Sequence, residues 1–163
     1  MRLNSLALRL FATSAAWTLL ALPLAGYIIY ALYREDVQLS FDAQLKKLLT
    51  QITIDSMSTM GDEPVIPPNL YEPLFEVTQS GWYWQITRTD TEKPEVRSSR
   101  SLWDKKLPKL EEQGVELTAA GIRLGYVDGP EGQNLRMVER PVDLGADGKY
   151  LVSVAGDDTE IFD

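Results

Sequence analysis

The hydrophobic residues of this chain are concentrated first in one long uncharged run. Residues 11–33 contain no charged residue, and 18 of these 23 positions are apolar. A helix needs about 20 apolar residues to cross the hydrocarbon core of a bilayer. The pattern therefore predicts a transmembrane helix over 11–33, a short segment 1–10 before it, and a single domain over 34–163.

A second pattern follows directly after this run. From Arg34 to Met57 there is no proline or glycine, and apolar residues recur at steps of three and four residues, which is typical of one face of a helix. We expect this helix to continue the transmembrane helix as one rod. Two interpretations of the stripe stay open. It packs only on its own domain, or part of it also faces a second copy in a homodimer. The stripe residues proposed for the dimer are Phe41, Leu45, Leu48 and Ile52.

The third pattern is a set of short runs rich in aromatic and β-branched residues. Such runs, bounded by turn residues, predict β-strands. The predicted strands cover 82–88, 96–102, 122–127, 135–142 and 150–155. Polar turns over 89–95 and 128–132 predict two hairpins, and 105–112 has room for at most two helical turns. The expected fold is α+β, with an antiparallel sheet of about five strands after a long helix.

The charge distribution indicates how the chain is oriented in a membrane. Residues 1–33 carry a net charge of +2, from Arg2 and Arg9, and the rest of the chain carries −10. By the positive-inside rule, residues 1–10 are cytoplasmic and 34–163 lie outside, which in a bacterium is the periplasm. A cleaved signal peptide ending near Ala25 is the alternative. The apolar run continues beyond that point to Tyr33, longer than a signal peptide requires, and this favours an uncleaved anchor in the inner membrane.

Composition removes several classes of function. The chain has no cysteine and no histidine, which excludes disulfides, thiol redox chemistry, histidine-based catalysis and most zinc sites. The acidic domain argues against binding to nucleic acid.

The order of the motifs resembles a known family. A short basic N-terminus and a membrane helix are followed by a long helix with Phe41-Asp42 and Leu45, the run from Trp82 to Ile86, and the run from Arg97 to Leu102. This order resembles the periplasmic input region of bacterial two-component sensor histidine kinases, most of all the PhoQ-like group of α-proteobacteria. The resemblance implies a PAS-like sensor domain that works as a homodimer and responds to a ligand or a partner.

The same resemblance implies parts that this sequence does not contain. A full-length kinase would continue with a second transmembrane helix, a HAMP linker, a phosphoacceptor domain and an ATP-binding domain. We expect the chain to end before that second helix, so the fragment itself is not an enzyme and holds no cofactor. ATP and a response regulator would belong to the full-length protein.

Three surfaces are candidates for the input site. Asp157, Asp158, Glu160 and Asp163 offer oxygen ligands for Mg²⁺ or Ca²⁺, and the resemblance implies a role in holding such cations against anionic lipid, although no metal site is assigned. Trp82 and Trp84 share one face of their strand, as core or as a ligand pocket. The third surface would bind a small periplasmic regulatory protein. Its candidates are Arg97, Arg100, Trp103 and the acidic stretch 109–116.

Two other functions stay open. The chain is alternatively a membrane-anchored periplasmic adaptor that binds another protein. It is alternatively an anchored hydrolase that uses paired carboxylates, either Glu111 with Glu112 or Asp157 and Asp158 with Glu160.

Overall fold

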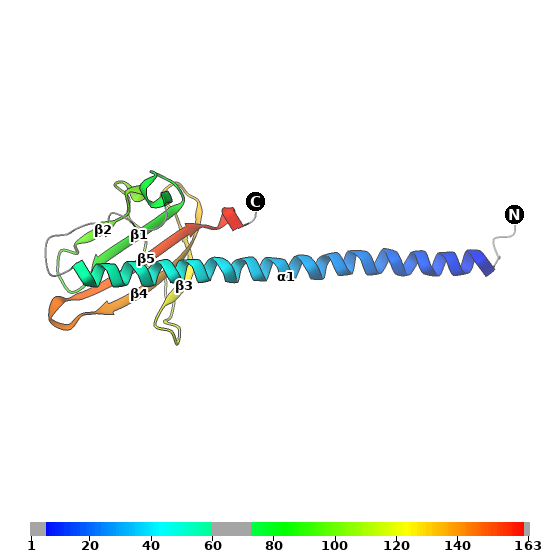
Figure 1. Ribbon diagram of the computed structural model, residues 1–163, viewed down its shortest axis with the longest axis horizontal. Coiled ribbons are helices and arrows are strands. Elements are labelled where there is room, and N and C mark those ends of the chain that lie inside the picture. The colour runs from blue at the N-terminus through cyan, green and yellow to red at the C-terminus, as the bar shows by residue number, and fades with distance from the viewer. Residues whose placement is uncertain (1–5, 60–72, 162–163) are drawn as a thin grey trace. The chain divides into compact units, whose positions relative to one another are not determined.

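The computed structural model describes residues 6–59 and 73–161 (Figure 1). The chain forms two compact units, Met1–Ser40 and Phe41–Asp163. Helix α1 (Leu6–Thr59) contributes residues to both units. One helix therefore covers both segments for which helices were predicted, and Pro23 lies inside it without ending it.

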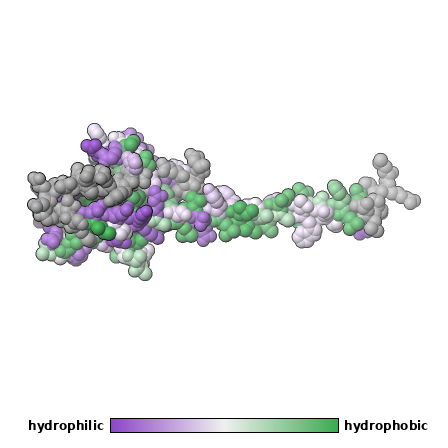
Figure 2. All heavy atoms as spheres, viewed as in Figure 1, coloured by the Kyte–Doolittle hydropathy of each residue, from purple (hydrophilic) through white to green (hydrophobic). Residues whose placement is uncertain are grey.

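In the first unit, the side chains of α1 are almost all exposed. Large apolar side chains such as Phe11, Leu20 and Ile29 are 66–73% exposed, and Figure 2 shows apolar surface along this part of the helix. The helix has a stretch with a mean hydropathy of 1.7 and is long and apolar enough to cross a membrane.

The second unit contains a five-stranded antiparallel sheet in the order β2-β1-β5-β4-β3. The strands are β1 (Trp82–Arg88), β2 (Val96–Ser98), β3 (Arg123–Asp128), β4 (Asn134–Asp143) and β5 (Lys149–Asp157). The α+β class is confirmed. Both predicted hairpins, β1 with β2 and β3 with β4, are confirmed as well.

The short elements differ from the prediction around residue 100. Strand β2 ends at Ser98 instead of continuing to Leu102, and Arg100–Leu102 forms the 3-10 helix η2. The chain turns here because Ser101 Oγ donates a hydrogen bond to the carbonyl oxygen of Trp82. Two further 3-10 helices, η3 (Gly145–Asp147) and η4 (Asp158–Ile161), flank β5, and η1 (Pro73–Glu76) precedes β1. Residues 105–109 have no regular secondary structure and 110–112 form a turn, so this segment contains no helix.

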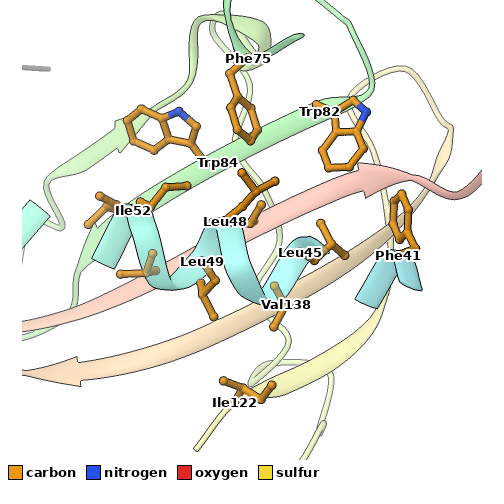
Figure 3. Packing of buried hydrophobic residues seen from close by; sticks show 13 residues of the cluster. Phe41, Leu45, Leu48, Leu49, Ile52, Phe75, Trp82, Trp84, Ile122 and Val138 are labelled. Atoms are coloured by element: carbon orange, nitrogen blue, oxygen red, sulfur yellow. The ribbon is translucent and has the colours of Figure 1, made fainter. Parts of the chain in front are cut away.

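The part of α1 in the second unit packs on one face of the sheet. Figure 3 shows Phe41, Leu45, Leu48 and Ile52 directed toward the strands, with Trp82, Trp84 and Phe75 beside them. The four stripe side chains are at most 9% exposed. The stripe therefore packs on its own domain. These contacts support the first interpretation of the stripe, and the second interpretation, that part of it also faces a second copy, stays a prediction.

Close approach of α1 to the sheet depends on Gly156. A Cβ atom at Gly156 would lie 2.7 Å from Cζ of Phe41 and 3.2 Å from the Trp82 ring. The rings of Phe41 and Trp82 have centroids 5.4 Å apart. Phe41 thus lies at the end of the sheet where β1 begins and β5 ends, which we call the entry end.

The other face of the sheet is covered by the long connection between β2 and β3. Its buried apolar side chains pack against residues of β1, β3, β4 and β5. The members of this second core are Tyr83, Leu102, Leu107, Leu110, Val127, Leu135, Met137 and Ala155. Both faces of the sheet are thus closed by the chain's own residues.

Candidate functional site

An ion pair at the entry end joins α1 to the sheet. Nε and Nη2 of Arg136 on β4 donate to Oδ1 and Oδ2 of Asp42 on α1, each at 2.9 Å. The two side chains are only 13% and 11% exposed, and the Arg136 guanidinium lies 4.7 Å from the ring centre of Tyr126. The hydrogen bonds to Asp42 raise the pKa of Arg136 further above its usual range. Two parallel bonds fix both the position and the angle of the guanidinium.

This helix–sheet ion pair is positioned by the local sequence. Asp42 follows Phe41 in the buried face of α1, and Arg136 precedes Met137 in a strand whose alternate residues face opposite sides. Removing one partner would leave the other charged and partly buried, which is far more costly than losing an exposed pair. The sheet and this part of α1 are therefore held in one defined arrangement.

A second buried polar cluster holds the long connection on the opposite face. Glu139 is fully buried and accepts hydrogen bonds from the Leu110 backbone N–H at 3.0 Å and from Arg123 Nη1 at 3.3 Å. Arg123 Nε also donates to the carbonyl oxygen of Val115. Burial raises the pKa of the Glu139 carboxyl, and the Leu110 and Arg123 contacts oppose that shift.

Strand β1 adds a further anchor for the same connection. The Gln85 side chain accepts a hydrogen bond from the Leu107 backbone N–H and donates to its carbonyl oxygen, at 2.9 and 3.4 Å. The connection is thus held through its backbone by three strands, β1, β3 and β4, which makes its position sensitive to single polar side chains.

Trp82 and Trp84 lie in the core beneath α1. They are 3% and 6% exposed and belong to the cluster that includes Leu45 and Leu48. Tyr83 and Gln85 face the other side of the sheet, as expected from strand alternation, and both are buried.

The candidate residues for a protein partner are at the surface. Arg97 is exposed on β2, and the Arg100 side chain is 81% exposed, with Nη1 3.3 Å from Oε2 of Glu76. Trp103 is 77% exposed, the largest exposed fraction among the apolar side chains given for either unit.

Two of the acidic candidates, Asp157 and Asp158, have side chains that the structure describes, and both accept hydrogen bonds from neighbouring residues. Asp157 Oδ1 accepts hydrogen bonds from the Thr159 N–H and hydroxyl, while Asp158 Oδ2 accepts one from Asn134. The side chain of Glu160 and all of Asp163 lie outside the described residues. Among the described residues, no group of three or more acidic side chains is placed to hold a metal ion.

Of the paired carboxylates considered for hydrolysis, Glu111 and Glu112 each form an ion pair with a basic side chain. Glu111 Oε1 lies 3.3 Å from Arg123 Nη2, and Glu112 Oε1 lies 3.1 Å from Lys109 Nζ. Each of these two carboxylates therefore lies beside its own basic partner.

Two of the most connected residues, Arg136 and Glu139, were not selected from the sequence. The available signal was a charged residue in a position that the pattern assigns to the core. Asp42 lies beside Phe41 in the apolar stripe, and Glu139 continues the alternation of Leu135 and Met137. Comparison of the chain with protein-family models, curated proteins and solved structures finds no match.

Proposed function

We propose that this chain is the extracytoplasmic signal-sensing input region of a membrane-bound two-component sensor histidine kinase. In this proposal, residues 11–33 anchor the chain in the bacterial inner membrane, 1–10 are cytoplasmic, and 34–163 form a PAS-like periplasmic domain. The observation that carries the proposal is that one unbroken helix, α1, contains both the membrane candidate and a face of the domain core.

This arrangement suits signalling because the domain contacts α1 through side chains with little freedom. Phe41 packs into the space above Gly156, and Asp42 is held by two bonds to Arg136. A ligand or partner that shifts the sheet would therefore act on α1 through these contacts. It would change signalling only by favouring one arrangement of the helix over another.

The proposal includes a homodimer, but with a different helix face from the one first expected. Within 41–55, the surface opposite the buried stripe contains Ala43, Lys47, Thr50 and Ile54, all exposed. Their steps of four, three and four residues place them on one side of the helix. This side is available to a second copy held in the same membrane.

The direct test is the reading frame downstream of codon 163. The proposal expects a second apolar run of about 20 residues, followed by a phosphoacceptor histidine domain and an ATP-binding domain. A stop codon soon after Asp163 would contradict it and would favour the anchored adaptor.

A functional test uses the helix–sheet ion pair in the full-length protein. Asp42→Asn should change autophosphorylation in membrane vesicles, because it loosens the contact between α1 and the sheet. Asp143→Asn is the matched control, since Asp143 is an exposed carboxylate paired with Lys149 on the same sheet. Equal autophosphorylation of both variants and the parent would count against signal transfer through this contact.

A further inference from the structure

Trp103 combines exposure with a backbone conformation that tryptophan rarely adopts. Its φ is 53° and its ψ is −114°, and the Lys105 N–H donates to the carbonyl oxygen of Leu102 at 2.9 Å. These values match the first central position of a type II′ turn, where glycine is the usual residue. Among the described residues, Gln79 is the other non-glycine residue with positive φ, and its N–H donates to the carbonyl oxygen of Ser101.

The turn that carries Trp103 is anchored on both sides by buried residues. Leu102 before it and Leu107 after it are 1% and 4% exposed, and both belong to the second core. The exposed side chain buries little apolar surface, so it does not offset the energetic cost of this backbone conformation. Such outliers often mark functional positions.

The charge around this turn is opposite to that of the domain. Residues 97–106 contain four basic residues and one acidic residue, whereas the whole of 34–163 carries −10. The basic residues are Arg97, Arg100, Lys105 and Lys106, and all four are exposed. We call Trp103 with Arg100, Lys105 and Lys106 the Trp103 surface.

The Trp103 surface belongs to the entry end of the sheet. Ser101 Oγ donates to the carbonyl oxygen of Trp82, whose ring packs on Phe41. Phe41 follows the end of the apolar run at Tyr33 by eight residues. Even fully extended, eight residues span at most about 30 Å. If 11–33 lie in a bilayer, the entry end is held within reach of its headgroups at high effective concentration.

We propose that the Trp103 surface docks on the anionic headgroups of the bilayer that holds the anchor. Tryptophan favours the membrane interface, where its ring meets the acyl boundary and its N–H meets water. Lysine and arginine near an anionic leaflet are attracted to it. Anionic headgroups repel the acidic side chains elsewhere on the domain. The domain would therefore contact the bilayer only through the Trp103 surface. The proposal depends on the membrane anchor and on no other part of the proposed function.

The test uses the full chain in lipid nanodiscs with a spin label beside the indole. Because the chain has no native cysteine, Asp104→Cys gives a single labelling site next to Trp103. Glu92→Cys is the matched control, an exposed acidic position in the β1–β2 loop at the opposite end of the sheet. The measurement is the collision rate of each label with oxygen, which partitions into lipid, relative to a water-soluble nickel chelate.

We expect the ratio of the oxygen to the nickel collision rate at position 104 to be higher in nanodiscs with about one third phosphatidylglycerol than in nanodiscs of pure phosphatidylcholine. The same ratio at position 92 should be equal in the two lipids. High salt should remove the effect. Replacing lysine by glutamine at 105 and at 106 should lower the ratio of docked to undocked protein by roughly fivefold for each lysine replaced. Trp103→Ala, at a position where the side chain is 77% exposed, should also lower this ratio without unfolding the domain.

Several results would overturn the proposal. A label at 104 that stays equally accessible to nickel in both lipids would exclude docking, and this is also the result expected if the surface serves an acidic protein. Docking that needs added Mg²⁺ and is lost in Asp157→Asn with Asp158→Asn would assign the contact to the acidic residues. A chain that does not enter nanodiscs at all would overturn the anchor together with the docking, whereas normal insertion without docking would leave the proposed sensor function intact.

Discussion

At Trp103 the backbone holds an L-residue where glycine is favoured. The left-handed side of conformational space costs such a residue about 1–2 kcal/mol. Trp103→Gly should therefore raise the free energy of unfolding by about 1 kcal/mol relative to Trp103→Ala, since alanine removes the indole but keeps the strain. Thermal unfolding followed by near-ultraviolet circular dichroism of both variants measures this difference. Equal stability of the two variants would show that the turn is unstrained.

Glu139 is a buried carboxyl whose pKa is raised by burial above the ordinary value of 4.5. The folded state then holds its proton to higher pH than the unfolded state. The stability that this group contributes is fully present below 4.5 and is lost as pH rises toward the folded pKa.

Glu139→Gln replaces the protonated carboxyl by its neutral isostere, so at acidic pH we expect the free energy of unfolding to change by less than about 1 kcal/mol. As pH rises above the ordinary pKa, the parent should lose stability relative to the variant, which does not titrate at this position. Urea unfolding of both proteins across a pH series measures this trend. A parent that gains stability over the variant as pH rises would mean that the folded structure favours the ionised carboxylate.

At the scale of elements, the helix–sheet ion pair decides how firmly α1 is held. Asp42→Asn leaves Arg136 partly buried without its counter-charge, and we expect a loss of about 3 kcal/mol in unfolding free energy. Asp143→Asn on the exposed pair with Lys149 should have no measurable effect. Denaturant unfolding of both variants tests this, and an equally small change in the two would show that the buried pair adds nothing.

The exposed side of α1 gives a sharper test of the homodimer. Single cysteines placed from Phe41 to Asp55 in membranes should crosslink best at Ala43, Lys47, Thr50 and Ile54. Phe41, Leu45 and Leu48 should crosslink poorly because the sheet covers them. A maximum at those three positions would mean that the helix leaves its own sheet in the membrane, and uniform absence of crosslinks would argue against a dimer along this helix.

The elements with regular patterns were the ones predictable from the sequence. β1 has the expected bounds, because the run from Trp82 to Arg88 is aromatic and β-branched throughout. The connection that follows β2 was not predictable in the same way. Its position depends on Gln85, Arg123 and Glu139, polar side chains from three strands, and no local pattern shows which backbone groups they bind.

The candidate site was predicted only in part for a similar reason. Exposure of Arg100 and Trp103 was expected for a binding surface, and the strain at Trp103 has no sequence signal apart from a tryptophan beside an aspartate in a turn-rich segment. Asp42 and Arg136 are 94 residues apart in sequence. A charged residue inside an apolar stripe indicates that a partner exists but does not identify it.

For the whole molecule, the charge asymmetry predicts orientation. Alkaline phosphatase fused after Phe162 should be active, because it folds only outside the cytoplasm, and a green fluorescent protein at the same position should be dark. Adding several arginines after Tyr33 should reverse both signals, since positive charge is retained in the cytoplasm. A bright fluorescent fusion in the unmodified chain would contradict the proposed topology.

The strand order has a consequence for biosynthesis. β5 is the last of the five strands to be synthesised, yet it lies at the centre of the sheet, between β1 and β4. Until residues 149–157 emerge, the two hairpins share no hydrogen-bonded neighbour, and an isolated hairpin is marginally stable at best. The domain therefore has no route to a complete sheet while it is still being made. If 34–163 are exported unfolded through a translocation channel, as the proposed topology requires, this delay keeps the domain unfolded until its final strand is available.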